Sequence, residues 1–344
     1  MMNTILDTAS FSFPGQGLMY LLLAFATVMG ISGAINLRQS RPVGERFTFW
    51  MFAAVNLLFL TGFIWICWFH YQIYCKLPLA LPAKLVAWYN NYLGAMNSQS
   101  PYGIPFLDTL RPPRYTVPVW IENEKYYFWF MCYSVMAFIA HLRIEHHRLR
   151  ALLHLLLFIQ VLILFFFTDP FSTPLPGFFA EIQPWFESAL SPMERIRLFM
   201  QLYPRMVFYY NASYMWVHPP MLFISYACIT LTFLTSVFML TSRDGAIEQA
   251  GYDFAKLGFM LLTVGMLIGY PWALKAWGKN WWWDPKICSS IMMWSVFSTY
   301  LHTRLYAGRT GMWYFTAALG IVCYLAMIFT FLTSLFFPGE HTSQ

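Results

Sequence analysis

Residues 219–241 read PPMLFISYACITLTFLTSVFMLT, an uninterrupted run without a charged residue. A helix needs about 20 mostly apolar residues to cross a bilayer. Because further stretches of the same kind follow one another along the chain, the sequence predicts an all-α polytopic integral membrane protein with eight transmembrane helices. The predicted crossings are 17–37, 47–70, 125–142, 151–168, 219–241, 255–274, 288–306 and 313–337.

The composition of the whole chain supports the same class. Of its 344 residues, 59% are hydrophobic and only 10% are charged, whereas a soluble domain carries roughly a quarter of charged residues. So few charges cannot cover a water-facing surface, which argues against soluble, disordered, nucleic-acid-binding and secreted disulfide-rich proteins. The six cysteines show no CxxC spacing and lie mostly within apolar runs, where free cysteine behaves as a small hydrophobe.

Basic residues set the expected orientation of the helices. Four short connections contain Arg or Lys, and they alternate along the chain at 38–46, 142–150, 242–256 and 303–312. Because Lys and Arg collect in cytoplasmic loops, these four connections are predicted to be cytoplasmic. Both termini and the remaining connections then lie on the outer side. This is the periplasmic side of a bacterial inner membrane or the lumenal side of a thylakoid membrane.

The same pattern divides the chain into three parts. An N-terminal half with four crossings (1–168) is followed by an outer segment (169–218) and a C-terminal core with four crossings (219–344). Residues 176–203 carry apolar residues at helical spacing interrupted by Glu and Arg, which predicts short amphipathic helices on the outer membrane surface. The stretch 76–120 is rich in Pro, Tyr and Asn and is predicted to be an irregular outer loop.

The residues most suited to chemistry are concentrated in WALKAWGKNWWWDPK, Trp272–Lys286, between two predicted crossings. We call this segment the Trp loop. A membrane-interface belt usually contributes one or two Trp at a helix end, and such a belt is one interpretation of this loop. The other is a platform for a large planar apolar ligand, because flat indole faces suit such a ligand. Its carboxylates could then meet Lys275, Lys279 and Lys286. The indoles of this platform are Trp272, Trp277, Trp281, Trp282 and Trp283.

Two histidines are expected on the same side as the Trp loop. His218 directly precedes a predicted crossing, and His341 follows the last one. Two histidines that bracket an aromatic platform are what axial ligation of a haem iron requires. Taken singly, each could instead be a polar residue that seeks water at the interface.

His302 is a separate candidate, since it lies toward the cytoplasmic end of the crossing 288–306. Ionisable groups at membrane depth are costly and default to functional candidates. A metal-binding His302 needs a partner at equal depth, which could be His141, His154 or a residue of another subunit. The alternative is an imidazole that extends to the inner interface. No GxSxG, GxxxxGK[ST] or HExxH motif is present, and no carboxylate pair within a crossing indicates transport.

The segment WGKNWWWDPK, Trp277–Lys286, resembles the WWD signature of the haem-handling proteins of cytochrome c maturation, a family that includes CcsA (also called ResC), CcmF and CcmC. The run YLHTR at Tyr300–Arg304, the number of predicted crossings and the outer histidine near the chain end are similar to the CcsA type. TDPF at Thr168–Phe171 and HPPML at His218–Leu222 are similar to CcmF.

The resemblance implies roles for individual residues. His218 and His341 would ligate the iron of haem b, held face-on against Trp277, Trp281, Trp282 and Trp283 with Lys275 and Lys279 at its edge. His302 matches the intramembrane haem ligand of the family, which implies a second haem. His218, His341 and Asp284 form the candidate catalytic set, and the expected role of Asp284 is to order the loop rather than to act as an acid.

The function implied by the resemblance is that of a subunit of a cytochrome c haem lyase. It would present haem to the CxxCH motif of an apocytochrome c for thioether attachment, together with a CcsB/ResB-like subunit and separate thiol-reducing partners. Two alternatives stay open: a haem exporter or chaperone without ligation activity, and a b-type haem electron-transfer subunit. Membrane lipid is an expected partner and nucleic acid is not.

Overall fold

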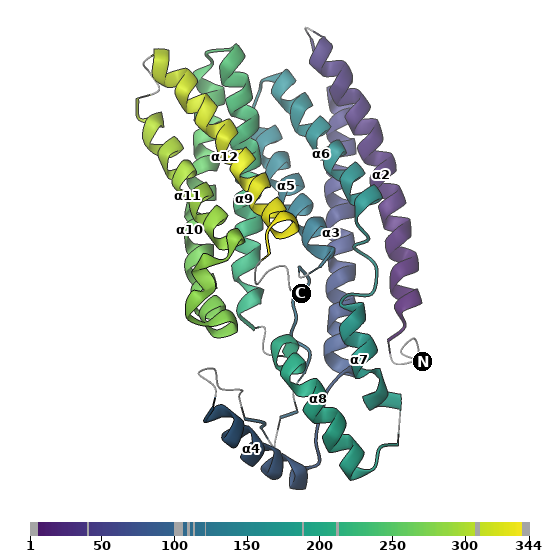
Figure 1. Ribbon diagram of the computed structural model, residues 1–344. Coiled ribbons are helices and arrows are strands. Elements are labelled where there is room, and N and C mark those ends of the chain that lie inside the picture. Colours follow the sequence, from purple (N-terminus) through teal and green to yellow (C-terminus); the bar gives the residue numbers. More distant parts are fainter. Residues whose placement is uncertain are drawn as a thin grey trace. The chain divides into compact units, whose positions relative to one another are not determined.

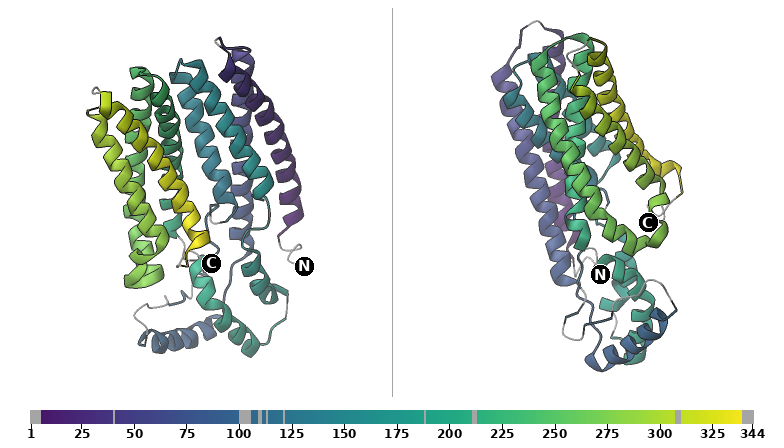
Figure 2. Two further views of the ribbon diagram at one scale, coloured as in Figure 1. Left: turned by 45° about the horizontal axis from the view of Figure 1, so that its top comes forward. Right: turned by 90° about the vertical axis from the view of Figure 1, so that its left-hand side faces the viewer.

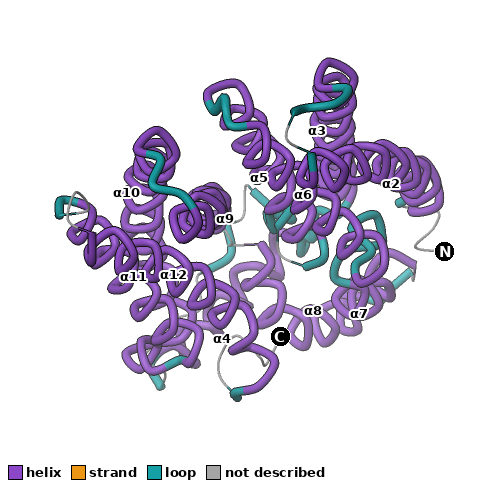
Figure 3. Tube along the Cα trace, turned by 90° about the horizontal axis from the view of Figure 1, so that it is seen from above, coloured by secondary structure: helices purple, strands orange, loops and turns teal. Residues whose placement is uncertain are grey.

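The computed structural model describes residues 6–39, 41–99, 106–108, 111–112, 114–120, 122–187, 189–210, 213–306 and 310–338. Within these ranges the chain is helical with no strand (Figure 3), which confirms the predicted all-α class. Two short 3₁₀ helices, η1 (Ser213–Trp216) and η2 (Gly278–Trp283), accompany the α-helices. These are α2 (Thr8–Arg38), α3 (Glu45–Lys76), α4 (Ala83–Asn97), α5 (Glu124–Arg143), α6 (His147–Phe167), α7 (Pro176–Glu187), α8 (Pro192–Tyr210), α9 (His218–Thr241), α10 (Gly245–Trp277), α11 (Pro285–Arg304) and α12 (Thr310–Phe336).

The helices form two compact units that alternate along the chain. We call them the loop unit (Met1–Gly17, Gly62–Lys125 and Asp169–Trp216) and the bundle unit (Leu18–Thr61, Tyr126–Thr168 and Val217–Gln344). The chain passes from the bundle unit to the loop unit after Thr168 and returns to the bundle unit after Trp216. These two positions are close to the ends, at 168 and 218, of the first two parts into which the sequence was divided.

In the bundle unit, the helix ends that flank the four short basic connections all lie at one end (Figures 1 and 2). The start of α9, the η2 turn and the end of α12 lie at the opposite end. This arrangement confirms the predicted alternation of helix direction. It also brings His218 and the Trp loop to the same end of the bundle.

Six of the described helices are long and apolar enough to cross a membrane, as judged by length and composition. The two other predicted crossings are present as α5 and α11, each a helix of 20 residues. Tyr and Trp in α5 and Ser and Thr in α11 make these two helices less apolar, so the count of eight crossings stays a prediction. The six spans are Thr8–Arg38, Glu45–Lys76, His147–Phe167, His218–Thr241, Gly245–Leu274 and Gly311–Thr333.

In the loop unit, the amphipathic segment predicted at 176–203 is confirmed as the helices α7 and α8. The prediction of an irregular loop at 76–120 is wrong for α4, because Val86, Tyr89 and Leu93 of α4 are buried at helical spacing. The ring of Tyr89 packs edge-on against Phe199 and Tyr203 of α8, with ring centroids 5.2 Å apart in both pairs. Burial against another helix therefore outweighs the Asn and Gly residues of α4, which disfavour helix in isolation.

The most extensive helix packing in the bundle unit joins α9 to α10, which lie side by side in Figures 1 and 3. Gly251, Gly258 and Gly265 recur every seven residues along α10 and face α9. A Cβ on Gly258 would lie 2.7 Å from Cβ of Cys228, and one on Gly265 would lie 3.0 Å from Leu222. At Gly251 a Cβ would collide with Thr235. Only glycine permits this backbone approach.

Hydroxyl groups of α9 donate hydrogen bonds to the carbonyls of these glycines. Ser225 Oγ lies 2.7 Å from the Gly258 carbonyl. Thr232 Oγ1 shares its single hydrogen between the carbonyl of Cys228 in its own helix, at 2.9 Å, and the Gly251 carbonyl, at 3.4 Å. Both the donors and the acceptors are seven residues apart, so the contacts form an antiparallel series that we call the glycine ladder. Such bonds between helices add to the packing energy inside a membrane.

The ladder predicts the effect of a single methyl group. We expect Gly258→Ala to lower the stability by about 1–3 kcal/mol, because the methyl group overpacks a filled interface. The midpoint of thermal unfolding in detergent measures the change. Gly17→Ala is the matched control, since a Cβ there meets no atom within 4 Å and Ala favours helix. A Gly258→Ala variant that unfolds at the wild-type midpoint would contradict the close approach.

Candidate functional site

His218 is the first residue of α9, with Pro219 and Pro220 directly after it in the first turn. Its Nδ1 atom lies 2.7 Å from the carbonyl oxygen of Gly265 on α10. A carbonyl can only accept, so Nδ1 carries the hydrogen and the neutral ring presents the lone pair of Nε2. This is the tautomer in which a metal-ligating histidine is usually held by a backbone carbonyl. His218 thus forms the third contact of the glycine ladder, seven residues before Ser225.

Gly269 provides the space for the His218 ring. A Cβ on Gly269 would lie 2.6 Å from both Nδ1 and Cε1 of that ring, closer than a non-bonded contact allows. The pair Gly265 and Gly269, one turn apart on α10, therefore forms a slot in which the imidazole lies close against the helix backbone. Sequence reasoning missed these glycines, although the seven-residue spacing of Gly251, Gly258 and Gly265 is visible in the chain and Gly269 follows four residues later.

A cavity of about 130 Å³ lies beside His218 within the bundle unit. Its walls are mostly apolar and aromatic, with Tyr270, Trp272 and Trp281 among the lining residues, and Lys286 is a charged residue of the lining. Trp281 and Tyr270 meet edge to face with ring centroids 5.2 Å apart. The structure thus brings the predicted residues His218 and Trp281 to one cavity.

The Trp loop is ordered at its far end by a helix cap. The Asp284 carboxylate accepts a hydrogen bond of 2.9 Å from the backbone N–H of Lys286, and Pro285 begins α11. Asp284 is buried and caps the start of α11, and its role in ordering the loop stays a prediction. Trp282 and Trp283 are exposed, with ring centroids 4.5 Å apart. The predictions for Lys275, Trp277 and Lys279 concern side chains outside the described part, and His341 lies wholly outside it.

His302 is exposed on α11, and its Nδ1 atom lies 2.9 Å from the carbonyl of Ser298 in the same helix. His302 is not among the residues that line the cavity at His218, which come from the opposite end of α11. No group of three or more His, Cys, Asp and Glu side chains suited to a metal ion occurs among the residues that the structure describes.

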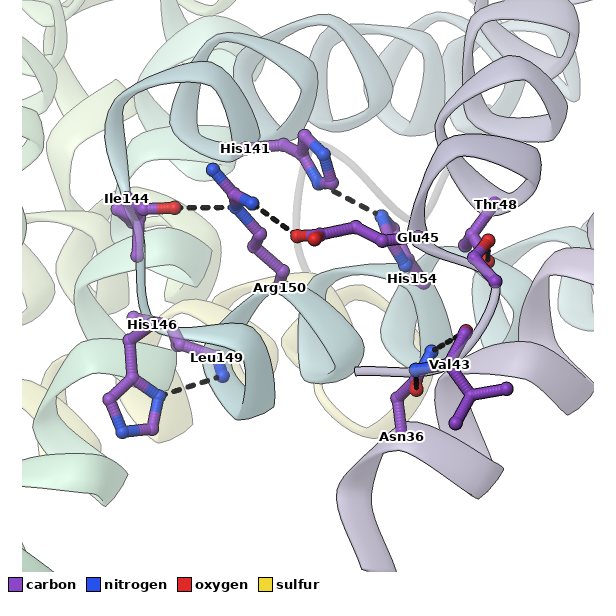
Figure 4. Close-up of polar contacts among 11 residues, drawn as sticks. Asn36, Val43, Glu45, Thr48, His141, Ile144, His146, Leu149, Arg150 and His154 are labelled. Atoms are coloured by element: carbon purple, nitrogen blue, oxygen red, sulfur yellow. Dashed lines mark hydrogen bonds and ion pairs between the residues drawn. The ribbon is translucent and has the colours of Figure 1, made fainter. Parts of the chain in front are cut away.

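The two histidines considered as partners of His302 contact each other instead (Figure 4). His154 Nε2 and His141 Nδ1 are 3.2 Å apart, and both side chains are buried. Beside them Arg150 pairs with Glu45 at 2.5 Å and donates to the carbonyl of Ile144. The structure therefore joins α5, α6 and the start of α3 through polar contacts at this end of the bundle.

The family described as cytochrome C assembly protein matches residues 119–341. Three curated relatives carry the name cytochrome c biogenesis protein CcsA. The protein from Chlamydomonas reinhardtii is 34% identical over 114 residues, 29% of this chain and 32% of its own. The protein from Synechococcus sp. (strain WH7803) is 41% identical over 91 residues, which cover 25% of this chain and 28% of the relative.

The CcsA protein from Cyanidium caldarium is 49% identical over 59 residues, which cover 17% of this chain and 20% of the relative. In each case the match spans about a third or less of the relative's length. No solved structure matches the chain.

If His218 ligates a haem iron, as the sequence leads us to expect, the slot geometry predicts that Gly269→Ala weakens this ligation. The added methyl group pushes the ring away from the Gly265 carbonyl, and loss of such an orienting contact typically costs about 10–100-fold in metal affinity. Titration of haem into the detergent-purified protein, followed by absorbance, measures the affinity.

Gly311→Ala is the control for this substitution, because a Cβ at Gly311 meets no atom within 4 Å. If Gly269→Ala bound haem as tightly as Gly311→Ala, the slot would have no part in ligation.

Proposed function

The chain belongs to the cytochrome C assembly protein family, and on this premise we propose that it is a haem-presenting subunit of a cytochrome c haem lyase. Its substrates would be haem b and an apocytochrome c with a CxxCH motif. A CcsB/ResB-like subunit would complete the lyase, and separate partners would keep the cysteine thiols reduced. The end of the bundle with His218 would face the periplasm or the thylakoid lumen.

The observation that carries this proposal is the orientation of His218. The Gly265 carbonyl holds Nδ1 at 2.7 Å, which leaves Nε2 as the electron-pair donor for an iron atom. An aromatic wall adjoins the ring, formed in part by Trp281 and Tyr270. A neutral imidazole beside flat apolar side chains fits the needs of a haem ligand.

The size of the cavity limits how haem would lie. A cavity of about 130 Å³ is close to the roughly 150 Å³ that accommodates benzene, so it takes only one part of a porphyrin. The remaining surface would come from the exposed Trp282 and Trp283 and from Trp277, with His341 as the second axial ligand. Lys286, which lines the cavity, is positioned to meet a propionate.

In the proposed mechanism these residues present haem to the apocytochrome. Haem supplies the vinyl groups to which the two cysteine thiols of CxxCH add. His218 keeps the substrate in place through one coordinate bond, and this bond must be exchangeable because the histidine of CxxCH takes an axial position in the product. Asp284 holds the start of α11 and thereby the end of the Trp loop.

We also propose that His302 ligates a second haem together with a residue of another subunit. Its Nδ1 is hydrogen-bonded to the Ser298 carbonyl, so Nε2 is again the available electron-pair donor, and its side chain is exposed. His141 and His154 are less suited to this role, because each is already paired with the other.

The first test is the absorption spectrum of the detergent-purified chain, oxidised and reduced. We expect wild type to show a bis-histidine b-type spectrum, and His218→Ala and His341→Ala to lose most of the bound haem. Added imidazole should restore the spectrum, since it supplies the missing axial nitrogen. His147→Ala serves as the matched control, because His147 bonds to Gln39 and does not line the cavity.

The second measurement separates a lyase from a haem carrier. His341→Ala with imidazole should still release haem to an acceptor, and thioether formation on an apocytochrome should report attachment. Wild type that transfers haem without forming thioethers in the complete subunit set would support the carrier. Haem-free wild type, with His218→Ala still active in cytochrome c maturation in cells, would refute haem ligation by His218.

A further inference from the structure

Positive charge is distributed unevenly over the end of the bundle unit where the helix ends that flank the four short basic connections lie (Figures 1 and 2). We call this end the basic end. The segments 38–46 and 142–150 contain six arginines and two glutamates, a net charge of +4. The segments 242–256 and 303–312 contain four basic and three acidic residues, a net charge of +1. The excess charge therefore gathers where α2 meets α3 and α5 meets α6.

The two strongly basic connections are joined to each other and ordered (Figure 4). Arg150 pairs with Glu45 at 2.5 Å across the two segments. The side chain of Asn36 donates to the Val43 carbonyl at 3.2 Å and accepts from the Val43 N–H at 2.7 Å. Gly44 then turns the chain with a φ of 63°, a left-handed conformation that favours glycine. These contacts make the two connections one continuous surface.

Arginines without an acidic partner cover this surface. Arg150 is neutralised by Glu45, whereas the other five arginines are exposed and form no ion pair with a described residue. The second acid of the two segments, Glu145, is also exposed. A guanidinium donates hydrogen bonds in a fork that matches a phosphate group. We call these five residues the arginine surface: Arg38, Arg41, Arg46, Arg143 and Arg148.

The other two connections of the basic end have much of their charge neutralised internally. Arg304 pairs with Glu248 at 2.6 Å, and Lys256 pairs with Asp253 at 2.9 Å. Their charges are therefore already balanced within α10 and α11. An anionic ligand would be attracted mainly to the arginine surface.

Apolar side chains lie one helical turn below two of these arginines. Ile35 precedes Arg38 by three residues on α2, and Trp50 follows Arg46 by four residues on α3, so each pair shares a helix face. Ile35 is 45% exposed and Trp50 is 58% exposed. In both helices the arginine lies nearer the basic end and the apolar residue lies deeper in a candidate membrane span. A matching ligand joins an anionic group to an apolar chain.

We propose that the arginine surface binds the head groups of anionic phospholipids, whose acyl chains lie along Ile35 and Trp50. The lipid phosphate accepts hydrogen bonds from the guanidinium groups. Each arginine near the membrane surface adds to the attraction for anionic lipids, so charge complementarity favours this ligand. The acyl chains cover the apolar side chains one turn deeper in the bilayer.

Two other anions match only the upper part of this surface. An acidic protein segment bound outside the bilayer would contact the arginines and leave Ile35 and Trp50 uncovered. Inorganic phosphate or a soluble phosphate ester would leave the same two side chains uncovered. A phospholipid accounts for both the charged and the apolar part.

The test is electron paramagnetic resonance of spin-labelled lipids with the full chain in detergent micelles. Phosphatidylglycerol and phosphatidylcholine with the same label and acyl chains differ only in the head group. We expect the motionally restricted signal to show about tenfold or more tighter binding of phosphatidylglycerol, because several arginines add their attraction. The preference should fall at high salt, since exposed charges are screened.

Two double variants locate the binding surface. Arg38→Gln with Arg46→Gln removes two charges of the arginine surface and should abolish most of the preference for phosphatidylglycerol. Arg243→Gln with Lys256→Gln is the matched control, because it removes two charges from another connection of the same end, and it should retain the preference. The midpoint of thermal unfolding verifies that both variants are folded.

The comparison of the two lipids on wild type does not depend on the folding of any variant, and equal affinity would overturn the proposal. An equal loss of preference in both folded double variants would also overturn it, since only the total charge would then matter. We expect neither hexaglutamate nor glycerol 3-phosphate to displace the lipid. Displacement by hexaglutamate would indicate an acidic protein segment instead, and displacement by glycerol 3-phosphate would indicate a site for soluble phosphate. Haem binding at His218 is measured separately, so the two proposals can fail independently.

Discussion

The close approach of α9 and α10 is the constraint on which the candidate haem site depends. Three residues of α9, seven apart, meet three glycines of α10, also seven apart, in antiparallel order. Because both series have the same step, the contacts stay in register along the two helices. The last contact is His218 on Gly265, so the position of the ring follows from the packing of the whole pair rather than from the loop before it.

Much of the architecture could be predicted from the sequence because it depends on one-dimensional patterns. Apolar runs and alternating basic loops predicted the helices and their directions, and both were found in the bundle unit. The helix α4 could not be predicted in this way, since the residues that stabilise it, Phe199 and Tyr203, lie a hundred residues later. Local composition describes the segment, whereas burial against α8 decides its structure.

In the candidate site, too, the sequence predicted the residue types but not their geometry. Its chemical groups, His218, Trp281 and Asp284, were visible as residue types in a recognisable segment. Their geometry was not, because it comes from Gly265 and Gly269, which carry no chemistry of their own.

The glycine ladder also limits how the length of this chain can vary. One residue added within 218–232 or 251–265 would turn the rest of that helix by about 100° and carry later hydroxyl groups or glycines out of the contact. An insertion of seven residues in both helices would restore the register, because about two turns bring the same face back. Natural length changes are therefore expected in the loops, while these two segments change length together or not at all.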